Sequence, residues 1–184
     1  MLESFKLARE LGFDNINMDL IAGLPTDTIE SFMSTIDDVI KLSPENVTVH
    51  TLSIKRCADL VNESESVINN PAPEMVSYAS KIITQNGYSP YYLYRQKNTL
   101  GNLENTGFSK LGKESLYNIF IMEEIQTILA VGAGASTKLV DKNKGIERIF
   151  NYKFPLEYNK HFDIMLEKKK QIMNFYNENL KGSL

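Results

Sequence analysis

The feature that most constrains the fold is an alternation of strand and helix patterns in the first third of the chain. Apolar and polar residues alternate over 15–22, which predicts a strand with one polar face. Apolar residues at helical spacing predict a helix before it, over 2–11, and another after it, over 29–40 with Asp27 as its N-cap. A second strand is expected over 46–54. Short connections between such elements indicate parallel βα units, whose ligands bind beyond the carboxyl ends of the strands.

The remainder of the chain contains a wider mixture of patterns. Only two βα units are evident, and an eight-stranded α/β barrel needs about 250 residues. This chain of 184 residues is too short for one. After the second strand we expect a helix over 73–87, strands over 91–94, 127–131 and 147–152, turns over 98–118, and a long helix over 156–180.

The composition argues against several classes of function. A net charge of −3, without a cluster of basic residues, speaks against a nucleic-acid partner. The longest apolar stretch, 125–139, is interrupted by glycines and a lysine, so we expect no membrane span and a cytoplasmic protein. One cysteine, Cys57, and two histidines cannot supply a cysteine-ligated iron–sulfur cluster or an ordinary structural zinc site. No metal ligands are therefore predicted.

Four segments, in this order, resemble the oxygen-independent coproporphyrinogen III oxidases, a family of radical S-adenosylmethionine (SAM) proteins. The similarity is greatest with the branch found in anaerobic Gram-positive bacteria, and it spans nearly the whole chain. A lone motif of this kind would be weak evidence, whereas the ordered set is specific. The segments are 13–26, which contains Asp19-Leu20-Ile21-Ala22-Gly23-Leu24-Pro25, then 47–56, 91–118, and Val131-Gly132-Ala133-Gly134-Ala135-Ser136.

The resemblance implies a fold and a reaction. The fold is α/β: the C-terminal portion of a radical SAM partial (β/α)6 barrel over 1–86, followed by an α+β extension and a C-terminal helix over 87–184. In the family, a [4Fe-4S] cluster held by three cysteines cleaves SAM. The resulting radical removes hydrogen from the propionates of coproporphyrinogen III, which are decarboxylated to vinyl groups. The cysteines and the first four strands would precede Met1, so this chain is expected to contain neither the cluster ligands nor catalytic residues.

The resemblance also assigns cofactor contacts. Asp19 would accept hydrogen bonds from SAM, and Ile21, Ser53 and Ser136 would contact the same cofactor. Each residue has an ordinary structural alternative. Asp19 could cap the following loop, Ile21 could serve the turn, Ser53 could be a half-buried strand residue, and the small residues before Ser136 could serve close strand packing.

Two basic residues are candidates for substrate binding. Arg95 and Lys97 could pair with the propionates of a porphyrinogen, because guanidinium and ammonium groups bind carboxylates. Alternatively, they form a solvated edge. His50 is expected to hydrogen-bond internally, and the tyrosines of 91–94 are expected to pack in the core, although they could also flank a flat macrocycle.

Three hypotheses for function remain open at the level of the sequence. The first is a fragment of an oxygen-independent coproporphyrinogen III dehydrogenase, the second a non-catalytic haem- or porphyrin-binding relative, and the third a truncated, inactive product. The expected partners are a porphyrinogen substrate and the missing N-terminal half of the barrel. Without that half, the strand over 15–22 has an open edge, so we also expect the chain to self-associate.

Overall fold

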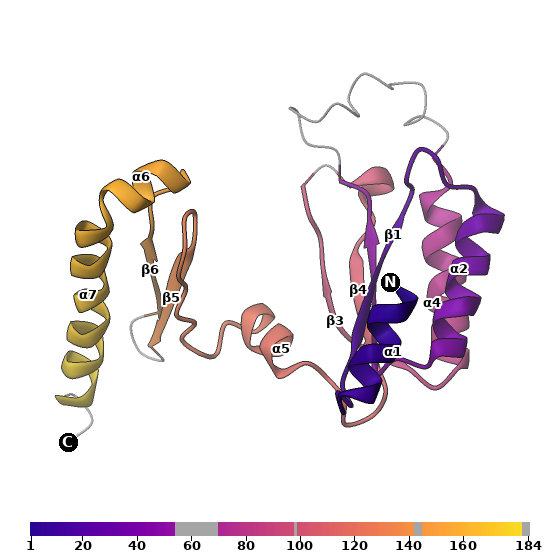
Figure 1. Cartoon of the computed structure of the whole chain (residues 1–184), viewed down its shortest axis with the longest axis horizontal. Helices are drawn as coiled ribbons and strands as arrows, with labels where there is room; N and C mark the ends of the chain where they lie inside the picture. The colour runs from indigo at the N-terminus through magenta and orange to yellow at the C-terminus, as the bar shows by residue number, and fades with distance from the viewer. Residues whose placement is uncertain (54–69, 98, 142–144, 182–184) are drawn as a thin grey trace. The chain divides into compact units, whose positions relative to one another are not determined.

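The computed structural model describes residues 1–53, 70–97, 99–141 and 145–181 (Figure 1). These residues form two compact units, Met1–Ile119 and Phe120–Leu184. The first unit holds a four-stranded sheet and the second a two-stranded one. The sequence instead predicted a division between the βα units of a barrel, over 1–86, and the elements that follow them, over 87–184. That division does not coincide with the two compact units, and it stays a prediction.

The sheet of the first unit is built on two parallel strands. β1 (Asn17–Ala22) pairs with β2 (Asn46–Thr51) along its whole length, which confirms the parallel pair expected from the βα pattern. β4 (Asn105–Ser109) pairs antiparallel with β2 on one side and with β3 (Ser89–Tyr94) on the other. The strand order is therefore β1-β2-β4-β3, and β1 lies at an edge of the sheet.

β4 corrects the expectation of turns over 98–118. The sequence of this strand, Asn-Thr-Gly-Phe-Ser, mixes Thr and Phe, which favour strands, with Asn and Gly, which disfavour them. It is nevertheless a strand because two neighbours pair with it, and four of its five residues are buried. Tertiary pairing outweighs local propensity here. A short 3-10 helix, η2 (Leu100–Asn102), precedes the strand.

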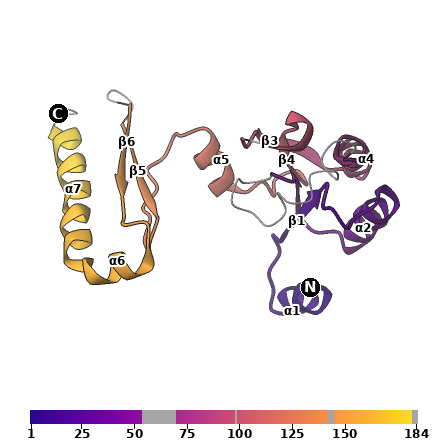
Figure 2. The same ribbon diagram turned by 90° about the horizontal axis from the view of Figure 1, so that it is seen from above.

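α2 (Ile29–Leu42) and α4 (Ala72–Gln85) pack against each other on one face of this sheet (Figure 1, Figure 2). α2 begins after Thr28, whose Oγ1 accepts a hydrogen bond from the Ser31 N–H at 3.1 Å. The expected N-cap Asp27 is therefore wrong. Its own N–H instead donates to the Leu24 carbonyl at 3.0 Å and closes the turn before the helix.

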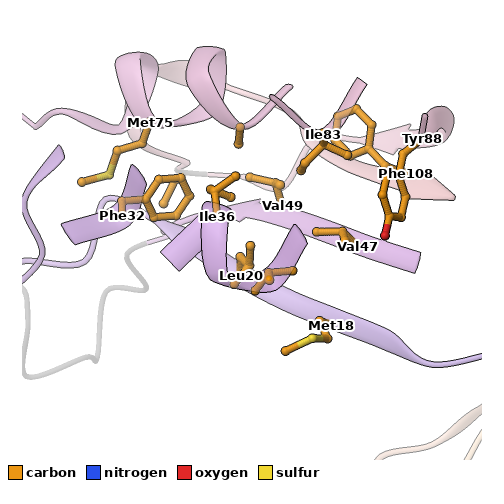
Figure 3. Packing of buried hydrophobic residues seen from close by; sticks show 13 residues of the cluster. Met18, Leu20, Phe32, Ile36, Val47, Val49, Met75, Ile83, Tyr88 and Phe108 are labelled. Atoms are coloured by element: carbon orange, nitrogen blue, oxygen red, sulfur yellow. The ribbon is translucent and has the colours of Figure 1, made fainter. Parts of the chain in front are cut away.

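The apolar residues of β1 and β2 form a core with these two helices (Figure 3). On β1, Met18, Leu20 and Ala22 are buried while the residues between them are exposed, as expected for a strand with one polar face. The helices contribute residues at helical spacing that are also almost fully enclosed. The buried helix residues are Phe32, Ile36 and Val39 from α2, with Ala72, Met75, Ala79 and Ile83 from α4.

α1 (Leu2–Glu10) is joined to the start of β2 by a partly buried ion pair. None of its residues is fully buried. Arg9 binds both carboxylate oxygens of Glu45, with two nitrogen–oxygen distances of 2.8 Å. The same carboxylate accepts the Ile16 N–H at 2.9 Å. Burial opposes ionisation of Glu45, but the hydrogen bonds from Arg9 and Ile16 outweigh it, so the pKa of Glu45 lies below its ordinary value.

The second unit consists of a β-hairpin and helices. β5 (Ser136–Asp141) pairs antiparallel with β6 (Gly145–Phe150), and α5 (Leu116–Met122) crosses the boundary between the units. The strand expected over 127–131 is wrong, since within the described residues this segment forms only one bridge, between Ile128 and Lys138.

The expected long C-terminal helix is broken into two. α6 (Pro155–Lys160) is separated from α7 (Phe162–Lys181) by His161, whose φ of −114° and ψ of 37° are not helical. α7 returns along the hairpin, and Lys169 donates to Ala130 O and Thr137 Oγ1 at 2.8 Å each. Burial lowers the pKa of Lys169. No helix in the described part of the chain is long and apolar enough to cross a membrane.

Candidate functional site

The face of the sheet opposite the helices is polar. It differs from the core face because β1 alternates strictly, so that Asn17, Asp19 and Ile21 all lie on the opposite side from the buried residues. Side-chain hydrogen bonds link β1 to β2 and β2 to β3 across this face. The residues that form this polar face are Asn17, Asp19, Thr48, His50, Tyr92 and Tyr94.

His50 lies between two of these polar side chains. Its Nε2 is 3.6 Å from Asp19 Oδ1 on β1, and its Nδ1 is 3.3 Å from the Tyr94 hydroxyl on β3. Asn17 Nδ2 donates to the same Asp19 oxygen at 2.8 Å. The Gln96 amide reaches the Tyr94 hydroxyl at 3.5 Å. Asp19 itself remains accessible, with 61% of its side chain exposed, so its carboxylate can still bind a ligand.

Tyr92 is a half-buried residue of this face that lies beside the almost fully buried Thr48. Its hydroxyl is 3.3 Å from Thr48 Oγ1, which in turn donates to Asn17 Oδ1 at 3.1 Å. Burial raises the pKa of Tyr92, so the phenol stays protonated at neutral pH. It therefore serves as a neutral hydrogen-bonding group.

A cavity of about 570 Å³ opens where β1 and β2 end. This is the position at which parallel βα units bind ligands. The cavity has both polar and apolar lining, which suits a ligand with an apolar ring and hydrogen-bonding groups. Its lining residues are Ile21, His50, Thr51, Leu52, Ser53, Gln96 and Lys97.

The structure brings three of the predicted site residues to this cavity and places a fourth beside it. Ile21, Ser53 and Lys97 line the cavity. Asp19 lies on β1 two residues before Ile21 and approaches His50, which also lines it. The roles assigned to these four residues stay predictions.

The hydroxyl of Ser53 is already engaged within the protein. It donates to the Lys97 carbonyl at 2.8 Å, and Ser53 forms an isolated β-bridge with Thr99. These contacts hold the loop after β3 against the end of β2. A ligand would therefore meet Ser53 mainly through its backbone.

Arg95 does not join the cavity lining. Its guanidinium pairs with Glu104 Oε1 at 3.0 Å, and both side chains are about half exposed. This geometry matches the solvated edge that the sequence left open for Arg95. Lys97, two residues later, is the basic side chain of this pair that lines the cavity.

Ser136 lies in the second unit, as the first residue of β5. Its Oγ is buried and has no hydrogen-bond partner among the described residues. The preceding loop contains Gly132 and Gly134 at positive φ, and Asn151 Nδ2 donates to the Gly132 carbonyl at 2.8 Å. The glycines therefore serve the turn itself, while the role of Ser136 in cofactor binding stays a prediction.

His50 hydrogen-bonds within the protein, as expected, but it also lines the cavity, which the sequence pattern did not predict. The tyrosines of 91–94 were expected to pack in the core, whereas Tyr92 and Tyr94 are half-buried on the polar face. The alternation of β2 could have revealed more, since His50 lies two residues after Thr48 and so shares its face. The pairing of β3 with β4, which brings Tyr94 to that face, has no clear signal in the sequence.

The residues present fit one of the two expected cofactors. SAM carries hydroxyls and an ammonium group, which can donate to the Asp19 carboxylate, and an adenine that suits the mixed lining beside Ile21. A three-cysteine cluster does not fit, because the whole sequence contains a single cysteine. The described residues also contain no group of three His, Cys, Asp or Glu side chains that could hold a metal ion.

Comparison with known proteins identifies relatives of the whole chain. It is 44% identical over 172 residues to the oxygen-independent coproporphyrinogen-III oxidase-like protein HemZ of Bacillus subtilis, a match that covers 91% of this chain and 34% of the relative. It is 27% identical over 178 residues to the haem chaperone HemW of Lactococcus lactis, covering 92% of this chain and 43% of that protein. No family model matches.

A solved structure shares the fold. The coproporphyrinogen III oxidase HemN of Escherichia coli, a radical SAM enzyme, superimposes with a TM-score of 0.54 at 20% identity, covering 86% of this chain and 36% of that one. The chain thus spans 34% of the length of the Bacillus subtilis relative and 43% of the length of the Lactococcus lactis relative. By sequence and fold, it is a relative of the oxygen-independent coproporphyrinogen-III oxidase-like proteins and corresponds to a C-terminal portion of them.

Proposed function

We propose that this chain is the SAM-contacting C-terminal portion of a radical SAM oxidoreductase that acts on coproporphyrinogen III in porphyrin and haem biosynthesis. The observation that carries the proposal is the cavity at the carboxyl ends of β1 and β2. Ile21, Ser53 and Lys97 line it, and the accessible carboxylate of Asp19 lies beside it. The 44% identity to a coproporphyrinogen-III oxidase-like protein over 91% of the chain supports the same assignment.

In this proposal the chain binds and orients SAM and the substrate. The radical chemistry depends on an iron–sulfur cluster whose ligands the chain does not contain. Asp19 accepts hydrogen bonds from the hydroxyls or ammonium of SAM, and Ile21 packs against its adenine. Lys97 offers an ammonium group to a propionate of the substrate. SAM, together with a cluster whose three cysteines this sequence does not supply, would provide the radical chemistry that the reaction needs.

A second candidate is a haem- or porphyrin-binding role without catalysis. It is favoured by the match to a haem chaperone, which covers 92% of the chain. In comparison, the match to the coproporphyrinogen III oxidase of Helicobacter pylori covers 34% of the chain, although at 41% identity. The two candidates differ in whether the porphyrinogen is converted.

A chimeric enzyme would test the proposal. The segment of the Bacillus subtilis relative that matches this chain would be replaced by the chain, and the chimera would be assayed anaerobically for SAM cleavage and for conversion of coproporphyrinogen III. We expect Asp19→Ala to weaken SAM binding by about 1–3 kcal/mol, the scale of a hydrogen bond to a charged group.

Ser53→Ala is the matched control, because the Ser53 hydroxyl is engaged with Lys97 O. We expect it to change SAM affinity much less than Asp19→Ala does. Equal losses in the two variants would contradict the assignment of Asp19. A chimera that binds haem but neither cleaves SAM nor converts the substrate would favour the chaperone-like candidate.

A further inference from the structure

Three side chains from three strands form a continuous contact chain across the polar face. Tyr94 on β3 meets the Nδ1 side of His50 on β2, and the Nε2 side of the same ring faces Asp19 on β1. The ring of His50 also lines the cavity at the end of these strands. The chain of contacts therefore runs from the side of the sheet to the carboxylate proposed to bind the ligand.

The carboxylate of Asp19 determines which groups donate and which accept along the contacts between Asp19, His50 and Tyr94. An ionised carboxylate can only accept hydrogen bonds, and His50 Nε2 lies 3.6 Å from Asp19 Oδ1, just beyond hydrogen-bond distance, so a neutral His50 that closes on Asp19 does so with its hydrogen on Nε2. Its Nδ1 is then an acceptor, and the Tyr94 hydroxyl must donate to it. The hydroxyl oxygen remains free to accept the Gln96 amide, which lies 3.5 Å away. All three contacts are consistent with this one arrangement.

We propose that His50 is a positioning residue for Asp19: the carboxylate of Asp19 selects the Nε2–H tautomer of His50, the donating Tyr94 hydroxyl stabilises that tautomer, and the Nε2–H orients the carboxylate toward the ligand. The inference rests on the proposed function in so far as the ligand is SAM. Both Asn17 and His50 approach Oδ1 of Asp19. In the described part of the chain this leaves Oδ2 to accept from a ligand hydroxyl or ammonium.

The first experiment measures the tautomer without any ligand. Nitrogen-15 NMR of histidine-labelled full chain distinguishes a protonated ring nitrogen from an unprotonated one, and the sequence contains only His50 and His161. The signals lost in His50→Gln assign those of His50. We expect neutral His50 to carry its hydrogen on Nε2, and Tyr94→Phe to produce a mixture of tautomers. An Nδ1–H tautomer in the unmodified chain would overturn the proposal.

The second experiment uses two variants of His50 whose amide groups each replace one of the two ring nitrogens. Glutamine at position 50 can place an amide N–H near the Nε2 position and reach Asp19, whereas the shorter asparagine can reproduce only the Nδ1 position. Calorimetric titration with SAM should show His50→Gln within about threefold of the unmodified chain and His50→Asn weaker by about tenfold.

The outcomes separate this inference from the proposed function. Equal SAM affinities for His50→Gln and His50→Asn would contradict the positioning role, because a merely structural ring would not distinguish them. An unmodified chain that binds no SAM would count against the proposed cofactor site instead. In that case the tautomer and its response to Tyr94→Phe would still decide whether His50 is held by Tyr94 and directed at Asp19.

Discussion

The ring of Tyr92 lies directly against Gly107 of the neighbouring strand, in the space that any side chain at position 107 would need. The glycine lets the ring cross β4 and bring its hydroxyl to Thr48 on β2. Gly107 is therefore required for close packing, and its backbone conformation is an ordinary extended one.

Gly107→Ala should destabilise the first unit by about 1–3 kcal/mol, the typical cost of overpacking. The new methyl group would overlap the Tyr92 ring and displace its hydroxyl from Thr48. Urea unfolding followed by circular dichroism would measure the loss. Because the clash involves one partner ring, the double variant Gly107→Ala/Tyr92→Leu should be more stable than the sum of the two single changes predicts. Additive losses would show that the ring does not limit the site.

Lowering the pH should weaken the attachment of α1 through Glu45. The pKa of this carboxyl is lower in the folded protein than its ordinary value of 4.5, so it contributes stability above that pH and loses it as the pH falls through the lowered value. Glu45→Gln should cost about 1–2 kcal/mol at pH 7 and much less at low pH. Unfolding curves at several pH values check this.

Glu10→Gln is the matched control for Glu45→Gln. Glu10 is an exposed residue of the same α1 helix, so its loss should leave stability nearly unchanged at every pH. A cost for Glu45→Gln that stays constant across the pH range would contradict the role of its ionised form in binding Arg9.

The chain by itself should bind no iron–sulfur cluster and should not cleave SAM. One cysteine cannot replace three cluster ligands, and the cleavage needs the electron that the cluster supplies. Anaerobic reconstitution with iron and sulfide, followed by optical and electron-paramagnetic spectroscopy, tests this expectation. A stoichiometric cluster that cleaves SAM on this chain would refute it.

The chain expressed alone should self-associate through β1. This strand pairs only with β2 in the described sheet, so its other edge offers N–H and C=O groups to a second copy, with Asp19 as the one charged residue along it. Light scattering after size-exclusion chromatography, over a series of concentrations, should show oligomers that dissociate on dilution.

Ile21→Lys should shift this equilibrium toward the monomer, because a second charge on the strand opposes edge-to-edge pairing. Leu111→Lys is the control, since Leu111 is 96% exposed and lies in a turn rather than on the strand. A stable monomer at high concentration, with the amides of β1 protected from hydrogen exchange, would mean that another segment covers this edge.

The local patterns predicted the βα part of the fold well, because its helices and strands bury one face each. The alternation in β1 and the helical spacing in α2 and α4 follow directly from that burial. β4 could not be predicted in this way, since it owes its strand conformation to partners on both sides. The break at His161 was also missed, because Pro155 and the later apolar residues fit one continuous helix.

In the candidate site, too, local sequence patterns do not predict the features that depend on contacts between distant residues. Ile21 lies near the end of β1 and Ser53 just after the end of β2, strand ends that the pattern locates approximately, and both residues line one cavity. Arg95 and Lys97 are two residues apart in an irregular segment, and only contacts from distant residues separate their environments. Glu104 binds Arg95, whereas Ser53 holds the backbone of Lys97 beside the cavity.

The strict alternation of β1 means that stability and the proposed ligand binding are encoded on different residues of the same six-residue strand. Met18, Leu20 and Ala22 can vary within the constraints of packing while Asn17, Asp19 and Ile21 change the ligand surface. Natural or directed evolution could therefore alter specificity here without first weakening the core. A single-residue insertion or deletion inside β1 has the opposite effect, because it would exchange the two faces and damage both properties at once.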